Sequence, residues 1–302
     1  MVLKHLSELK DILVDKPTRR LVLAAAQDQT SLSSVISAAR DGYIEPILVG
    51  DKEAIQNIAS QNNLDISGVR MIHEPDTDVA VEIAVKMVRS NQADILMKGK
   101  VGTSTLLKAV LNKEWGLRTG TLLSHIAIFE VEAYHKLIAV TDVAMNIAPN
   151  LQDKIAIVNN SVACLNRLGI ELPKVAVLGA VEMVSENMQA TLDAALLSKM
   201  NQRDQIKHCI IDGPLAFDNA ISLDSANHKG IRSDVAGDTD LLLMPDIEVG
   251  NVLYKSLVFF AHAKVAAVIL GAMVPIVLTS RSDSDQAKYD SILLAAAVAK
   301  NE

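Results

Sequence analysis

Apolar runs and amphipathic segments alternate along most of the chain. Short apolar runs that end in glycine or a polar residue predict buried strands, and segments with apolar residues every three or four positions predict helices. Strands that alternate with helices of about ten residues or more indicate parallel βαβ units and an α/β fold. The predicted strands cover 20–26, 45–50, 69–73, 93–97, 174–178, 209–212, 265–271 and 276–279, and the predicted helices cover 1–16, 31–40, 52–61, 76–90, 151–168, 185–200, 250–263 and 283–300.

The middle of the chain departs from this alternation. Two strand-like runs, 121–130 and 136–141, lie close together and predict an antiparallel pair. We see no internal repeat, low-complexity tract or flexible linker in the sequence. We therefore expect two α/β domains with a mostly parallel sheet, the first formed by 1–121 with 275–302 and the second, 122–274, inserted into it.

Composition narrows the class of protein. The 302 residues are 50% hydrophobic but only 3% aromatic, so the core must consist mainly of Ala, Val, Ile and Leu, as in parallel sheets covered by helices. A formal net charge of −7 argues against a nucleic-acid partner, which would require a basic face. It leaves room for a local basic pocket that binds an anionic metabolite.

Cysteine usage and hydropathy indicate the compartment. Cys164 and Cys209 lie in apolar segments without metal-ligand spacing, which favours buried, reduced thiols and a cytoplasmic protein. Residues 1–16 are charged and amphipathic, unlike a signal peptide. The longest apolar run, Val265–Thr279, is too short to cross a bilayer, so we expect a soluble protein with no membrane partner.

The stretch from His228 to Asn251 has the form of a ligand-facing edge. It contains a polar loop with Lys229 and Ser233, a short apolar strand, and a second polar loop before a helix-like segment. Groups at the carboxyl ends of parallel strands face the crevice in which ligands bind. We expect this stretch to face a ligand.

A second candidate loop follows the strand 93–97. Lys98-Gly-Lys-Val-Gly-Thr-Ser-Thr105 supplies lysines, hydroxyls and the N–H groups of a helix start, which together suit an anion. The spacing is not that of a Walker motif. The alternative is an ordinary helix start with solvated lysines.

Three further strand ends carry polar groups. Asp142 and Asn146 more plausibly orient a loop than perform chemistry, whereas Asp212, before a turn at Gly213-Pro214, is a catalytic candidate. In Thr279–Asp285, Ser282 or Asp283 could simply cap the last helix. Arg281 suits phosphate or a developing oxyanion, because a guanidinium beside hydroxyls at a helix start binds anions well.

Several chemistries lack their usual motifs. The seven histidines show no zinc-ligand spacing, and the acidic residues do not cluster as in a magnesium site, although Asp142, Asp212 and Asp246 could converge in space. There is no G-x-S-x-G elbow and no G-x-G-x-x-G fingerprint, which disfavours a serine hydrolase and a nicotinamide-binding Rossmann protein. We expect no metal.

Several short motifs occur along the chain in a fixed order. They are Met97-Lys-Gly, Leu123-Ser-His125, Thr141-Asp142, Asp212-Gly-Pro-Leu, Lys229-Gly-Ile, Val235-Ala-Gly237, Pro245-Asp-Ile, Gly250-Asn251 and Leu278-Thr-Ser-Arg281. Their ordered combination resembles the phosphate acetyl/butyryltransferase family. The chain length and the Leu-Thr-Ser-Arg-Ser-Asp-Ser ending are most similar to the phosphate butyryltransferase branch. No single motif is specific, and the resemblance runs from roughly Leu21 to the C-terminus.

This resemblance implies a fold, a reaction and a set of substrates. The family's fold has two α/β domains with a cleft between them, similar to isocitrate and isopropylmalate dehydrogenases, and its members are usually homodimers. The reaction is reversible: acyl-CoA and inorganic phosphate give acyl phosphate and CoA by direct transfer in a ternary complex. Coenzyme A is then a substrate, and no cofactor is implied. A butyryl or similar short or branched acyl group is expected from the branch, while the sequence leaves the chain length open.

The resemblance also assigns roles to residues. It places Ser280 toward the carbonyl or leaving group and Arg281 toward the phosphate and oxyanion. The family's acetyl branch has an aspartate base a few residues later, but here Ala287 follows Gln286, so Asp283 or Asp285, or otherwise Asp212 or Asp246, would be the base. By position, Lys98, Thr103 and Lys108 would help to bind the CoA phosphates from the first domain, and Lys229, Ser233 and Asn251 would line the cleft from the second.

Two other functions stay open at this point. A NAD-dependent oxidoreductase can use the same fold, but it usually needs a divalent metal and the acidic cluster for one is missing. A non-catalytic CoA-binding protein would bind the ligand without turnover.

Overall fold

A computed structural model describes residues 2–278 and 283–300. The chain forms two compact units. Unit 1 comprises Met1–Glu8 and Leu122–Val265, and unit 2 comprises Leu9–Thr121 and Ala266–Glu302. We describe each unit by itself, and the domain limits expected from the sequence stay a prediction.

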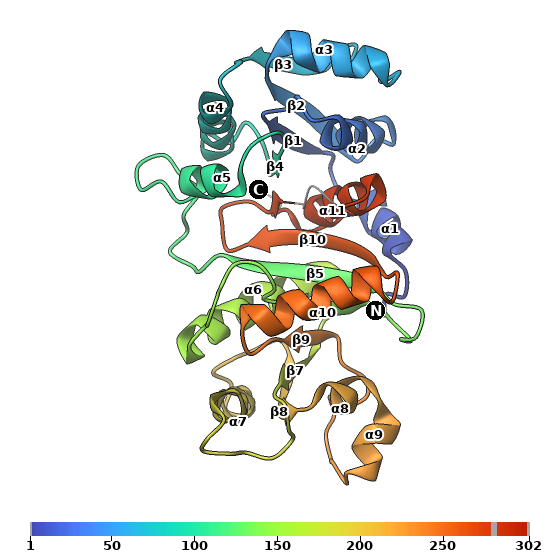
Figure 1. Ribbon diagram of the computed structural model, residues 1–302, viewed down its shortest axis with the longest axis vertical. Coiled ribbons are helices and arrows are strands. Elements are labelled where there is room, and N and C mark those ends of the chain that lie inside the picture. The colour runs from blue at the N-terminus through green and yellow to red at the C-terminus, as the bar shows by residue number, and fades with distance from the viewer. Residues whose placement is uncertain (1, 279–282, 301–302) are drawn as a thin grey trace. The chain divides into compact units, whose positions relative to one another are not determined.

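Unit 2 is built on a mostly parallel sheet (Figure 1). Its elements are α1 (Leu9–Val14), β1 (Arg19–Ala24), α2 (Gln29–Arg40), β2 (Ile44–Gly50), α3 (Lys52–Gln61), β3 (Arg70–His73), α4 (Thr77–Arg89), β4 (Ile95–Lys98), α5 (Thr103–Val110), β10 (Lys264–Leu270), β11 (Ile276–Val277) and α11 (Asp285–Val298). The strand order is β3-β2-β1-β4-β11-β10, and only the β10–β11 pair is antiparallel. The chain winds outward from β1 in one direction and returns to β4 on the other side. The crevice at the carboxyl ends of β1 and β4 is therefore the switch point at which such sheets bind ligands.

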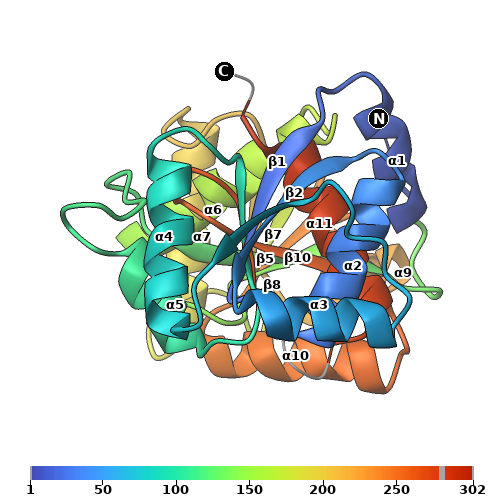
Figure 2. The ribbon, with the colours of Figure 1, turned by 90° about the horizontal axis from the view of Figure 1, so that it is seen from above.

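Helices cover both faces of this sheet. Figure 2 shows α4 on one side of β1 and β2, and α2 with α11 on the other. Three helices begin after an aspartate whose side chain accepts first-turn N–H groups: Asp28 for α2, Asp51 for α3 and Asp76 for α4.

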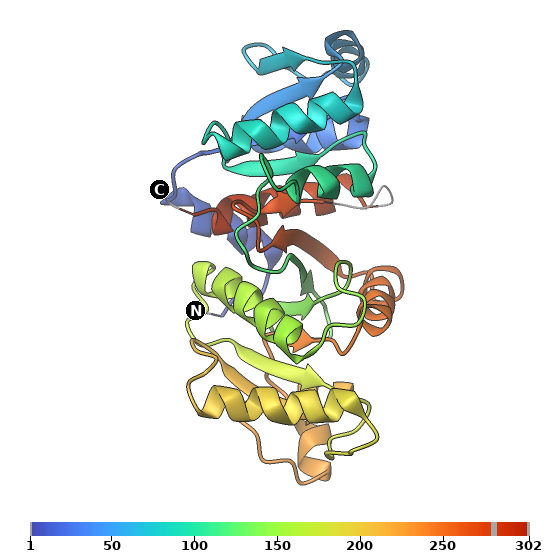
Figure 3. The ribbon, with the colours of Figure 1, turned by 90° about the vertical axis from the view of Figure 1, so that its left-hand side faces the viewer.

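Unit 1 has a smaller sheet, again mostly parallel. Its elements are a 3-10 turn (Leu6–Glu8), β5 (Ser124–Glu130), β6 (Ile138–Thr141), α6 (Leu151–Arg167), β7 (Lys174–Leu178), α7 (Gln189–Gln202), β8 (Ile210–Leu215), α8 (Phe217–Ile221), α9 (Leu223–His228), β9 (Leu241–Leu243) and α10 (Ile247–Phe259). The order is β5-β6-β9-β7-β8, with β5 antiparallel to β6 and the other pairs parallel. The predicted antiparallel pair is confirmed. Figure 3 shows α6 and α7 along one face of these strands.

Strand β8 corrects the predicted turn at Gly213-Pro214. The strand continues through both residues, and Leu215 pairs with Leu178 of β7. Proline removes a backbone donor, so it is tolerated in a strand that has a neighbour on one side only. Within the described order β8 is such an edge strand, and that property cannot be seen in local sequence.

Other helix boundaries differ from those predicted, because capping residues and short helices leave only weak patterns in the sequence. Helix α10 begins at Ile247 after the cap Asp246, earlier than predicted, and α11 begins after Ser284 rather than Ser282 or Asp283. Helices α8 and α9 were not predicted, because five and six residues show too little periodicity. The expected helix over 1–16 is a 3-10 turn followed by the short α1.

The core has the expected composition. Ala, Val, Ile and Leu dominate the buried hydrophobic residues, and Phe129 is the largest of the fully buried side chains. Helix α11 is buried from Lys288 to Val298, so it is enclosed by other elements of unit 2, including α1 and α2.

Candidate active site

The carboxyl ends of β6, β9, β7 and β8 form one edge of the unit 1 sheet, because these strands are parallel neighbours. Strand β5 is antiparallel and begins at the same edge. Of the residues singled out from the sequence, Asp212 lies in β8, and Asp142, Lys229, Ser233 and Asn251 lie in the segments that follow β6, β8 and β9. This edge is therefore the candidate site of unit 1.

Asp142 organises the loop after β6. Its carboxylate accepts hydrogen bonds from the backbone N–H groups of His125, Ala144 and Met145 at 2.9–3.2 Å, and from Asn146 Nδ2 at 2.6 Å. Asp142 is buried, so these donors replace the water that a carboxylate requires. The sequence-based expectation that Asp142 and Asn146 orient a loop agrees with these contacts.

His125, whose backbone N–H donates to Asp142, has a buried side chain. Burial lowers the pKa of His125, and the nearby Asp142 carboxylate offsets only part of that effect. The imidazole is therefore neutral at neutral pH. Its ring lies 6.3 Å from the ring of Tyr254 of α10, edge to face, and its buried Nδ1 has no hydrogen-bond partner among the described residues.

Helix α10 packs closely on the same loop. Gly250 is required there, because a Cβ atom would lie 2.5 Å from the carbonyl oxygen of Asp142. The predicted substrate residue Asn251 is half-buried, and its Nδ2 donates to the carbonyl oxygen of Val143 at 3.3 Å. The other candidate in this region, Asp246, caps α10 by accepting the N–H of Val249. Both side chains therefore have structural partners.

Lys229 lies in a polar cluster that the sequence did not reveal. It is the C-cap residue of α9, and its ammonium donates to Glu182 Oε2 at 3.0 Å and to Asn219 Oδ1 at 3.4 Å. Asp218 Oδ2 is 3.9 Å away. These partners come from the loop after β7 and from α8, up to 47 positions away in the chain, so no local motif could have identified them.

The remaining unit 1 candidates make local contacts. Ser233 Oγ accepts the N–H groups of Val235 and Ala236, which closes a turn. Asp212 is half-buried in β8 and accepts the N–H of Gly213 at 2.8 Å. Within the part of the chain that the structure describes, no hydrogen bond or ion pair joins Asp212 to the Lys229 cluster.

In unit 2, Lys98 shapes the loop after β4. It is 8% exposed, and its ammonium donates to the carbonyl oxygens of Gly99 and Val101 at 3.3 and 3.4 Å. Gly99 is packed against the turn after β1, where a Cβ atom would lie 2.2 Å from the carbonyl oxygen of Ala25. The structure therefore brings Lys98 to the switch point, where its ammonium donates to carbonyl oxygens of its own loop.

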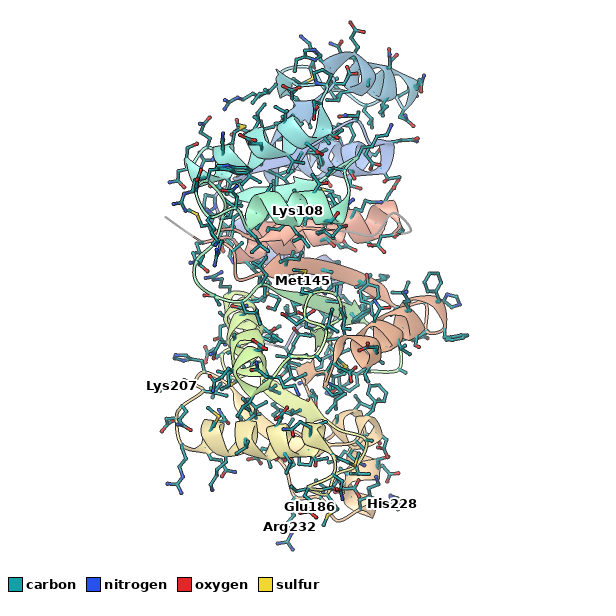
Figure 4. All side chains as sticks on the ribbon, turned by 60° about the vertical axis from the view of Figure 1, so that its left-hand side comes forward. Lys108, Met145, Glu186, Lys207, His228 and Arg232 are labelled. Carbon is teal, nitrogen blue, oxygen red and sulfur yellow. The ribbon has the colours of Figure 1, made fainter. Side chains whose placement is uncertain are left out.

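The start of α5 suits an anion better than Lys98 does. Thr103 is exposed at the first helical position, and the N-cap residue Gly102 makes no side-chain capping bond. In the described part of the chain no side chain caps the first-turn N–H groups, and such groups bind anions. Lys108 is exposed in the last turn of the same helix (Figure 4).

The candidates around 280–285 are only partly described. Ser280 and Arg281 lie outside the described residues. Asp283 is half-buried, and its carbonyl oxygen accepts a hydrogen bond from Lys288 Nζ at 3.0 Å. Lys288 also lies near Asp28: burial alone would raise the pKa of Asp28, but hydrogen bonds from Ser31 and Thr30 and the charge of Lys288 lower it.

Two wider features of the described chain bear on the site. In residues 2–278 and 283–300, no group of three or more His, Cys, Asp or Glu side chains is arranged to hold a metal ion. None of the helices in these ranges is long and apolar enough to cross a membrane.

Comparison with known proteins identifies the family. The model of the phosphate acetyl/butaryl transferase family matches residues 74–296. A phosphate butyryltransferase of Clostridium beijerinckii is 47% identical over 296 residues, covering 98% of each chain. A branched-chain phosphotransacylase from Enterococcus faecalis has a structure with a TM-score of 0.82 at 35% identity, covering 93% of this chain and 99% of that one.

A more distant likeness concerns the fold alone. A 4-hydroxythreonine-4-phosphate dehydrogenase from Burkholderia phymatum has a TM-score of 0.57 at 13% identity, covering 95% of this chain and 100% of that one. The expected dehydrogenase-like α/β fold is thus confirmed, whereas the oxidoreductase function is not favoured. The match of the family model and the full-length identity show that the chain belongs to the phosphate acetyl/butaryl transferase family.

Proposed function

We propose that this enzyme reversibly transfers a butyryl or similar short or branched acyl group between coenzyme A and inorganic phosphate. The observation that carries the proposal is the likeness to a phosphate butyryltransferase over nearly the whole of both chains. The branched-chain phosphotransacylase likeness supports an acyl group larger than acetyl. Coenzyme A is a substrate in this reaction, and the proposal needs no cofactor.

The chemistry is a direct attack on the acyl carbon. In one direction a phosphate oxygen attacks the thioester carbonyl, a tetrahedral oxyanion forms, and the C–S bond breaks to release the CoA thiolate, which takes up a proton. In the other direction the thiol loses its proton, sulfur attacks the acyl phosphate, and the C–O bond to phosphate breaks. The enzyme must hold two anionic substrates together and stabilise the oxyanion.

We assign these tasks to the residues that follow β11. Arg281 stabilises the phosphate and oxyanion with its guanidinium, and Ser280 donates toward the carbonyl or leaving group. Asp283 is the preferred base for the thiol, with Asp212 as the alternative. The hydrogen bond from Lys288 to the Asp283 carbonyl supports the first choice, because it fixes the backbone directly after this segment.

Binding of the CoA phosphates is assigned to the start of α5. Thr103 and the uncapped first-turn N–H groups form the anion site, and Lys108 adds positive charge on the same helix. Lys98 acts by holding the loop, which its two bonds to backbone carbonyls support. Ser233 and Asn251 shape the loops at the unit 1 edge and contact substrate from there.

A homodimer in the cytoplasm completes the proposal. Helix α10 supports the dimer, because much of its surface is apolar and exposed: Val252 is 65% exposed, Phe259 64% and Phe260 87%. Sedimentation of the wild type and of a Phe259→Ser, Phe260→Ser variant tests this. Dissociation of the variant supports an interface at α10, and a wild-type monomer refutes the dimer.

The proposed reaction is tested by incubating the protein with butyryl-CoA and phosphate. Loss of the thioester with formation of acyl phosphate is the expected result. Reduction of NAD without thioester loss would establish an oxidoreductase instead, and CoA binding without turnover would establish a binding protein. Comparing acetyl-, butyryl- and isobutyryl-CoA then ranks the acyl groups.

The proposed mechanism is tested at Arg281. Loss of an oxyanion donor lowers kcat by about 10²- to 10³-fold. The kcat of the Arg281→Ala variant should therefore be lower than that of the wild type by at least this factor. Arg281→Lys keeps the charge and should recover part of the activity. Normal turnover of Arg281→Ala would refute the assignment.

A further inference from the structure

The Lys229 ammonium is held in a fixed position at the carboxyl edge of unit 1. Glu182 and Asn219 accept hydrogen bonds from it at 3.0 and 3.4 Å. Asn219 is fully buried, so this acceptor cannot move freely, whereas the Lys229 side chain stays 40% exposed. An ammonium has three N–H donors, which leaves one for a ligand.

The charge around this ammonium disfavours phosphate. One positive charge, on Lys229, faces two carboxylates, those of Glu182 at 3.0 Å and Asp218 at 3.9 Å, so the three groups together carry a net charge of −1. The hydrogen bond from Lys229 lowers the pKa of Glu182, so this partner is ionised at neutral pH. A dianionic phosphate at Lys229 would be repelled by both carboxylates. An uncharged oxygen would not.

Exposed apolar residues adjoin members of this cluster in the chain. Glu182 stands between Val181 and Met183, which are 37% and 71% exposed, and Phe217, next to Asp218, is 40% exposed. The loop that carries Met183 is anchored at its far end, where Thr191 Oγ1 donates to the Ser185 carbonyl and accepts the Ser185 N–H. The loop that carries Val181 and Met183 is therefore fixed by hydrogen bonds at this end.

We propose that Lys229 binds the pantetheine arm of the acyl-CoA substrate by donating a hydrogen bond to one of its amide carbonyl oxygens. Val181, Met183 and Phe217 then contact the methyl and methylene groups of the arm. The arm is uncharged, carries two amides and is otherwise largely aliphatic, which matches one free donor in a negatively charged surrounding beside apolar side chains. This inference deepens the proposed function and rests on it.

The test compares substrates that share the arm but differ in charge. Butyryl-CoA and butyryl-pantetheine carry the same arm, and only the first carries the nucleotide phosphates. With Lys229→Gln, the KM of both thioesters should rise by the same factor, about tenfold, because a hydrogen bond from a charged donor is lost, while the KM of inorganic phosphate stays unchanged. Lys229→Arg keeps a charged donor and should lie between the wild type and Lys229→Gln.

A matched control is Lys207→Gln. Lys207 is an exposed lysine of the same unit, before β8, and in Figure 4 it lies on the opposite side of the unit from His228, the neighbour of Lys229 in the chain. The control should leave all three KM values unchanged. Thermal unfolding of each variant shows that it is folded.

Three results would overturn the inference. They are a rise in KM for butyryl-CoA alone, a rise in KM for phosphate, or no rise in KM for either thioester in Lys229→Gln. Glu182→Gln adds an independent check, because it changes the charge sum from −1 to 0. Under the inference it leaves the KM of phosphate unchanged. A marked fall in that KM would mean that Lys229 is a phosphate site and would overturn the inference.

Failure of the proposed function can be told apart from failure of this inference. If the wild type does not convert butyryl-CoA and phosphate, the proposed function fails, and calorimetric titration of CoA and pantetheine into the wild type and Lys229→Gln replaces the kinetic test. If Lys229→Gln binds CoA and pantetheine more weakly by the same factor, the contact between Lys229 and the pantetheine arm is still supported. The inference is refuted if the two affinities fall by different factors, if neither falls, or if the wild type binds neither ligand.

Discussion

The buried ion pair between α6 and α7 offers a quantitative test of how unit 1 is stabilised. Lys154 Nζ lies 2.6 Å from Asp193 Oδ2, and both side chains are only 5% exposed. Gln189 Nε2 donates to the other carboxylate oxygen at 2.8 Å. Removing the lysine leaves a buried carboxylate with one neutral donor, and breaking a buried pair in this way costs about 3–5 kcal/mol.

The expected size of the effect follows from the size of the unit. For a unit of roughly 150 residues, each kcal/mol lowers Tm by about 2–4 °C, so Lys154→Met should lower the Tm of unit 1 by about 10 °C. The measurement is thermal unfolding followed by circular dichroism or calorimetry. The exposed pair of Lys86 and Glu82 is the control, and Glu82→Gln should cost less than about 0.5 kcal/mol.

The double variant Lys154→Met, Asp193→Leu distinguishes the physical cause. If the cost comes from an unpaired buried charge, replacing both partners by apolar groups should restore most of the lost stability. A double variant as unstable as the sum of the two single variants would refute this reasoning. So would a loss of less than about 1 kcal/mol in Lys154→Met.

Three further predictions concern stability and reactivity. Burial raises the pKa of Cys164 to about 12 and of Cys209 to about 11, so neither thiol should react with Ellman's reagent in the native protein, and both should react after unfolding. Burial alone would raise the pKa of Asp238, but hydrogen bonds from neighbouring Lys and His side chains hold it well below its usual range. Ionised Asp238 therefore stabilises the folded protein above about pH 4, and this contribution is lost as the pH falls below that value. The Tm of Asp238→Asn should fall less between about pH 6 and pH 3 than the Tm of the wild type. Gly250→Ala should be destabilising in urea unfolding, because its Cβ would lie 2.5 Å from a carbonyl oxygen, and it should cost more than Gly102→Ala, whose Cβ would have its nearest neighbour at 3.8 Å.

The sequence alone determined the class of fold and the family. Apolar runs such as 20–26 and 93–97 contain enough local information to identify buried parallel strands, and 121–130 with 136–141 identified the antiparallel pair. Family membership followed from many short motifs in a fixed order, since each motif alone is common. Both properties are encoded along the chain and need no knowledge of distant contacts.

Only the tertiary structure decided how the candidate residues are used. Lys98 and Lys229 are both lysines near strand ends, yet one donates to carbonyls of its own loop and the other to Glu182 and Asn219. Pro214 lies within a strand because β8 has a neighbour on one side only. Such roles depend on residues tens of positions away, and the spacing of residue types along the chain does not determine which distant side chains will meet.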